Sequence, residues 1–75
     1  MPRYFFHVQN HIRTQDHDGV ELPDIETARH EASKDIKDIV RQHFETLDNH
    51  AWARWSIEIC DKAGAVLLVV PFSEN

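Results

Sequence analysis

The sequence predicts an α+β fold with two layers, in which one long helix lies across one face of a small, mainly antiparallel sheet. Two observations lead to this prediction. Helical periodicity occurs in one central stretch only, and segments rich in β-favouring residues lie on both sides of it. Turn-favouring residues, Asp18-Gly19 and Asp61–Gly64, join the segments within each side. The predicted order is strand, short strand, helix, strand, strand, in a single domain over residues 1–75.

Residues 3–9 predict the first strand, because three consecutive aromatic rings and Val8 all favour extended backbone. Alternation divides this strand into two faces. Its even positions share one face: Tyr4, Phe6 and Val8. Phe5 and His7 would lie on the other face. Both faces of the first strand therefore carry large side chains.

The next stretch is polar from residue 10 to residue 18 and predicts a loop, which Asp18-Gly19 closes. Residues 19–22 predict a short strand that returns beside the first. Pro23 ends this strand, and Asp24 is a good helix N-cap because its carboxylate can accept hydrogen bonds from the free amides of the first turn.

A helix is predicted from about residue 25 to residue 46. Its apolar positions recur at three- and four-residue spacing: Ile25, Ala28, Ala32, Ile36, Ile39, Val40, Phe44 and Leu47. His43 falls within this stripe and is interpreted as a packed histidine. Asn49 is the expected left-handed residue at the helix end.

The last two strands are predicted on either side of the hairpin connection at residues 61–64. In the first of them Trp55, Ile57 and Ile59 would face inward, whereas its other positions face outward: Ser56, Glu58 and Cys60. Residues 65–70 are apolar on both faces. Pro71 is expected to end the pairing, because proline has no N–H to donate.

Composition limits the function. Thirteen acidic residues against eight basic ones give a net charge of −5, so we expect no nucleic-acid partner. The chain has no apolar run of the roughly 20 residues that a membrane span needs, and no secretory signal, so no membrane association is expected. One cysteine, Cys60, cannot form an internal disulfide, and the expected location is cytoplasmic.

The chain resembles a family of short bacterial proteins known only as a domain of unknown function. The resemblance rests on the opening Met1-Pro2-Arg3-Tyr4-Phe5-Phe6-His7, on the segment Asp16-His17-Asp18-Gly19-Val20-Glu21-Leu22-Pro23-Asp24, and on the closing Asp61, Gly64, Leu67 and Val70-Pro71-Phe72. It implies a small cytoplasmic α+β protein and assigns no activity, cofactor or catalytic residue. A looser resemblance links the chain to small antitoxin domains with a truncated ribonuclease-H-like fold, although those place extra strands before the helix.

No constellation of residues predicts catalysis, and we expect neither an enzyme nor a bound cofactor. Cys60 lies beside acidic residues, which would raise the pKa of its thiol. The densest group of metal-binding residue types is the loop with His11, Asp16, His17 and Asp18. No cysteine pair supports a site there, so a solvated loop is the favoured interpretation and no metal site is predicted.

The leading functional hypothesis is a protein-interaction module that associates with itself, as a homodimer, through the open face of the sheet. One helix covers one face only, whereas the first and last strands are apolar on both. The candidate interface residues are Phe5, His7, Trp52, Val66, Leu68 and Val70. The alternative is a regulatory, antitoxin-like partner of another bacterial protein, bound through the same face.

Overall fold

The computed structural model describes residues 1–9, 13–43 and 54–74 of the chain. In these residues three strands precede the helix and two follow it. The elements are β1 (Arg3–Gln9), β2 (Arg13–Thr14), β3 (Val20–Glu21), α1 (Ile25–His43), β4 (Ser56–Cys60) and β5 (Val66–Pro71), with a 3-10 turn at Phe72–Glu74. The predicted α+β class is confirmed, with one additional strand.

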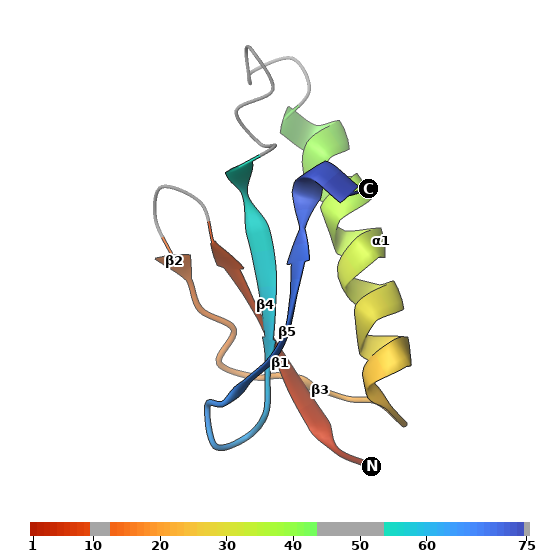
Figure 1. The fold of residues 1–75 in the computed structure, drawn as a ribbon, viewed down its shortest axis with the longest axis vertical. Coiled ribbons are helices and arrows are strands. Elements are labelled where there is room, and N and C mark those ends of the chain that lie inside the picture. Colours follow the sequence, from red (N-terminus) through yellow and green to blue (C-terminus); the bar gives the residue numbers. More distant parts are fainter. Residues whose placement is uncertain (10–12, 44–53, 75) are drawn as a thin grey trace.

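The sheet is antiparallel throughout, in the order β2-β1-β4-β5 (Figure 1). β3 pairs with the start of β1, placing Val20 opposite Tyr4, while β2 pairs with its end, placing Thr14 opposite Val8. Most of the predicted loop therefore runs beside β1. The sequence pattern missed β2 because two polar residues show no periodicity, and backbone pairing with β1 alone makes them a strand.

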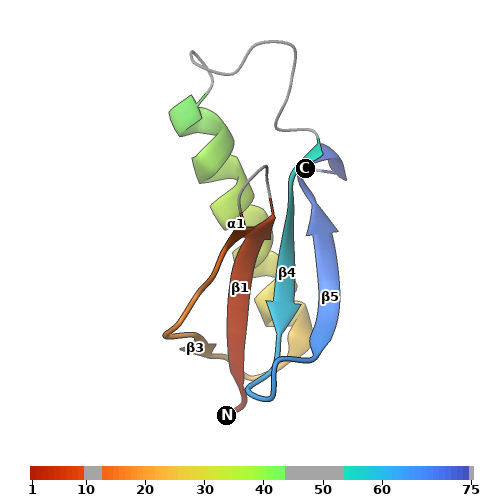
Figure 2. The same cartoon turned by 90° about the vertical axis from the view of Figure 1, so that its left-hand side faces the viewer.

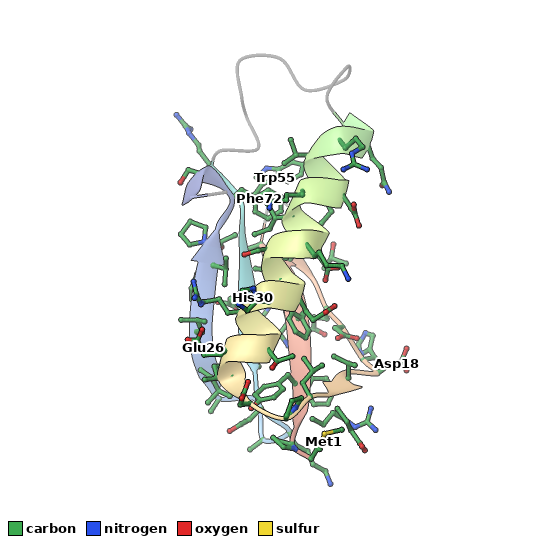
Figure 3. All side chains as sticks on the ribbon, turned by 90° about the vertical axis from the view of Figure 1, so that its right-hand side faces the viewer. Met1, Asp18, Glu26, His30, Trp55 and Phe72 are labelled. Carbon is green, nitrogen blue, oxygen red and sulfur yellow. The ribbon has the colours of Figure 1, made fainter. Side chains whose placement is uncertain are left out.

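The helix crosses one face of the sheet, and the core lies between the two layers (Figure 3). Ala28, Ala32 and Ile36 are the buried positions of α1, as its spacing predicts. Asp24 caps it as expected, accepting hydrogen bonds from the amide and the hydroxyl of Thr27, both at 2.8 Å. The expected positions beyond residue 43, including Asn49, and the side chain of His43 lie outside the described residues.

The sheet contributes the other half of the core. Its members face α1: Tyr4, Phe6, Val8, Ile57, Ile59, Leu68 and Val70. Phe72 has the largest fully buried side chain among the described residues, and it packs edge-to-face on Trp55 with ring centroids 5.7 Å apart. Periodicity did not identify Phe72 as a core residue, because it follows the proline that we expected to end the strand.

The expectation that Pro71 ends the pairing is wrong by one residue. Pro71 lies opposite Ser56, and the Phe72 amide still donates to the Trp55 carbonyl at 3.0 Å. Hydrogen-bonded and non-hydrogen-bonded pairs alternate along an antiparallel ladder. A bonded pair at Phe72 therefore leaves Pro71 at a non-bonded position, where the missing N–H interrupts nothing.

Two predicted interface residues lie on the wrong face for that role. Leu68 and Val70 belong to the helix-facing side, because the sheet register sets them opposite Ile59 and Ile57. The register shifts between Ile59 and Cys60, so that Val66 rather than Leu67 lies opposite Cys60. An apolar strand gives no periodic signal for its inner face, so the sequence could not choose between the two registers.

Figure 2 shows the sheet from its other side, with β1, β4 and β5 in front and α1 behind them. No helix in the described residues is long and apolar enough to span a membrane.

Candidate interaction surface

The open face is partly covered by the chain itself, starting at Phe5. Gly19 has a φ of +69°, and a Cβ there would lie 2.9 Å from both Arg3 Cγ and Phe5 Cε2. The Phe5 ring therefore lies directly against the backbone of Gly19, the residue that precedes β3. This contact leaves Phe5 half-buried.

Asp16 fastens the same segment to β1. Its Oδ2 accepts a hydrogen bond from the Phe6 amide at 3.2 Å, and its Oδ1 accepts from the amides of Asp18 and Gly19 at 3.1 Å each. Partial burial raises the pKa of Asp16, but the bonds from Gly19, Phe6 and Asp18 and the nearby His7 outweigh burial, so the pKa lies below its ordinary value.

His7 completes this attachment. Its Nδ1 accepts a hydrogen bond from the Asp16 amide at 3.0 Å, so in this arrangement the ring proton is on Nε2. His7 and Phe5 both lie on the face that the sequence predicts. Both are half-buried by contacts within the chain, which makes the β1 side of the open face a poor candidate for a partner.

Charged pairs occupy the rest of that side. Arg3 bonds the Asp18 carbonyl at 2.8 Å and forms an ion pair with Glu21 at 3.2 Å. In the middle of the sheet, Glu58 accepts from Gln9 Nε2 at 2.9 Å and pairs with Arg13 at 3.1 Å. The open face is thus polar over β1 and the centre of β4.

The apolar part of the open face lies on β5. We call it the β5 patch, and its residues are Val66, Leu67 and Val69. Their exposed fractions are 51%, 47% and 46%, whereas Val70 on the opposite side of the same strand is 7% exposed. Val66 is the only member of the β5 patch among the interface residues that the sequence predicts. The register shift brings in Val66, which strict alternation from Leu68 and Val70 would have placed on the helix-facing side. Trp52, the remaining predicted interface residue, lies outside the described residues.

The turn that leads into β5 is also held by an aspartate side chain. Asp61 Oδ1 accepts hydrogen bonds from the amides of Ala63 and Ala65, both at 2.9 Å. Gly64 has a φ of +90°, a conformation that residues with side chains rarely adopt.

A family model described as a domain of unknown function, DUF6894, matches residues 3–73. The chain belongs to this family. No curated protein and no solved structure matches it.

Five of the residues on which the sequence resemblance rests have structural roles in this chain. Asp16 and Gly19 attach a segment to β1, Asp24 caps α1, and Asp61 and Gly64 build the turn before β5. Turn and cap chemistry therefore explains these five positions in this DUF6894 chain.

Cys60 lies on the open face, as predicted, but it is only 1% exposed in this DUF6894 chain. Burial, followed by the charge of Glu58, raises the pKa of its thiol. A buried thiol with a raised pKa is a weak nucleophile. Cys60 therefore behaves as a small apolar residue between Phe5 and Val66.

In the part of this DUF6894 chain that the structure describes, the residues of the histidine-rich loop do not come together as metal ligands. No group of three or more metal-binding side chains occurs in those residues. Asp16 already accepts three amide hydrogen bonds, and His17 and Asp18 are exposed. His11, the fourth candidate, lies outside the described residues.

Proposed function

We propose that this DUF6894 chain is a small cytoplasmic protein-interaction module that associates with itself through the β5 patch. The observation that carries the proposal is the β5 patch: three neighbouring apolar side chains, each about half exposed, on the last strand of the described sheet. Clustered apolar surface of this kind is typical of interaction sites.

The rest of the open face supports this location. Over β1, Phe5 and His7 contact the residue 16–19 segment, and Glu58 is engaged by Gln9 and Arg13. A partner that binds over β1 would therefore have to displace these internal hydrogen bonds, whereas a partner that binds at β5 would displace none of them. The β5 side offers the smaller desolvation cost.

We further propose that the module has no catalytic activity and no nucleic-acid partner. A net charge of −5 opposes binding to phosphate backbones, and the raised pKa of Cys60 disfavours a thiolate nucleophile. The free thiol of Cys60 is compatible with a reducing, cytoplasmic compartment.

Solution mass at increasing micromolar concentration tests the proposal. The wild-type chain should approach twice the monomer mass, and Val69→Lys, which puts a charge into the β5 patch, should remain monomeric. Val20→Lys is the matched control, because Val20 is a 41%-exposed valine on β3, away from the patch. A wild-type chain that stays monomeric at every concentration would falsify self-association.

The alternative is a regulatory, antitoxin-like module that binds a different protein through the β5 patch. It predicts a monomer in isolation and a specific protein retained by the wild-type chain but not by Val69→Lys during co-purification from the native host. Retention by both variants would place any partner elsewhere on the chain.

A further inference from the structure

We propose that two copies of the chain pair antiparallel through the outer edges of β5, joining their sheets into one continuous sheet. This inference rests on the proposed self-association and adds the partner, a second copy, and the way in which it binds.

The outer edge of β5 has backbone groups directed away from the sheet. β5 ends the strand order, with only β4 beside it among the described strands (Figure 2). The bond from the Phe72 amide to Trp55 fixes the alternation of the β4–β5 ladder, so Val70 directs its N–H and C=O toward β4. By the same alternation, Val69 directs its own groups to the outer edge, where an added strand would bond them.

The size of the β5 patch favours edge pairing over contact between two patches face to face. Three half-exposed Val and Leu side chains present on the order of 150 Å² of apolar surface. A stable interface buries about 800 Å² on each partner. Patch contact alone falls well short of this area. Edge pairing adds main-chain hydrogen bonds and brings side chains on both faces of β5 beside those of the second copy.

Charge distinguishes the two edges of the sheet. The edge formed by β2 and β3 carries Arg13 and Glu21, which are held in ion pairs with Glu58 and Arg3. Charged side chains of this kind discourage strand addition. β5 contains no charged residue over its whole length, Val66–Pro71. A copy of β5 can therefore approach β5 without direct repulsion, although each chain carries a net charge of −5.

A second copy is also the occupant that β5 geometry matches best. A two-fold axis perpendicular to the sheet relates two identical strands in antiparallel orientation, so the same surface serves on both chains. The register shift at Val66 and Pro71 at the other end limit the pairing to the middle of β5. Each chain contributes the outer edge of its own β5 to the pair and has no second β5 edge to offer. This assembly therefore closes as a dimer rather than extending into a fibre.

Amide hydrogen exchange at low and high protein concentration tests this geometry, with Val70 as the internal control. The Val69 amide should exchange at least roughly tenfold more slowly in the dimer, whereas the Val70 amide, bonded to β4 in either state, should change little. If the chain is dimeric but the Val69 amide exchanges as fast as in the monomer, edge pairing is wrong and self-association stands. If the wild-type chain is a monomer throughout, both proposals fall.

The variant Val69→Pro gives a second test. It removes the N–H that faces the outer edge and leaves the β4–β5 hydrogen bonds in place. A folded, monomeric variant supports edge pairing, and a folded, dimeric variant contradicts it. Should the variant not fold, the exchange of Val69 in the wild-type chain decides the question alone.

Discussion

At the scale of single residues, Asp16 stabilises the fold by holding three amides with one carboxylate. Asp16→Asn keeps one oxygen, which can still accept hydrogen bonds from the amides of Asp18 and Gly19. Its NH2 group then faces the Phe6 N–H, so two donors meet and that hydrogen bond is lost. We expect a loss of about 1–2 kcal/mol of unfolding free energy at pH 7. Urea denaturation measures it. Asp18→Asn is the control, because Asp18 serves Arg3 through its backbone carbonyl, and it should change stability by less than about 0.5 kcal/mol.

The pH dependence of this difference follows from the lowered pKa of Asp16. A carboxyl group whose pKa is lower in the folded chain adds stability above its unfolded value, about 3.9, and loses that stability as the pH falls through the folded pKa. The gap between wild type and Asp16→Asn should therefore narrow below about pH 4. A gap that stays constant down to pH 2 would show that the charge of Asp16 is irrelevant.

The two glycines with positive φ provide a matched pair of substitutions. Gly64→Ala meets open space, so it should cost only the backbone strain of about 1–2 kcal/mol. Gly19→Ala carries similar strain and also drives a Cβ to 2.9 Å from Phe5 and Arg3, so it should cost at least about 1 kcal/mol more. Thermal or urea unfolding of both variants measures the difference. Equal losses would mean that Phe5 moves away without cost.

At the scale of elements, the sequence predicts the inward face of a helix or strand where its apolar residues recur with a clear period. The helix and β4 have clear periods, and the structure confirms Ala28, Ala32 and Ile36 as inward, together with Ile57 and Ile59. β5 is apolar at every position before Pro71, so its faces could not be assigned, and the register shift beside Val66 has no signature in composition. Of the β5 residues predicted for the interface, Val66 is therefore exposed on the open face, whereas Leu68 and Val70 face the helix.

The role of Gly19 beside Phe5 also escaped the sequence analysis. In the sequence, the residue types at positions 16–18 indicate either metal-binding chemistry or a solvated loop. An aspartate followed two residues later by Asp-Gly is also a signal for a turn held by the aspartate side chain. Only the structure shows that this turn lies against β1.

One helix position carries an unfavourable charge. Asp35 on α1 is exposed, yet partial desolvation and the neighbouring Glu31 and Asp38 raise its pKa. Because a raised carboxyl pKa means that folding favours the protonated form, stability falls as the pH rises through the folded pKa. Asp35→Asn should therefore stabilise the chain at pH 7, by about 0.5 kcal/mol or less, and make little difference at pH 3. Parallel thermal melts at the two pH values measure this, and destabilisation at pH 7 would contradict it.

At the scale of the whole molecule, the proposed dimer links stability to concentration. A 75-residue chain buries a smaller share of its surface on folding than a larger domain does, and pairing through β5 would add to the buried surface. Unfolding of a dimer releases two chains, so each tenfold rise in concentration stabilises it by about 1.4 kcal/mol, or about 0.7 kcal/mol per chain. For a domain of this size, that corresponds to a rise in Tm of roughly 3–5 °C.

Thermal melts at three concentrations, each ten times the last, therefore give a direct reading of the assembly. The wild-type Tm should rise at each step, and so should that of Val20→Lys, whose substitution lies on β3. The Tm of Val69→Lys should be independent of concentration, because a lysine in the β5 patch must either be desolvated or hold the copies apart. If all three proteins melt at concentration-independent temperatures, the β5 patch does not join two copies, and a different protein becomes the occupant to seek.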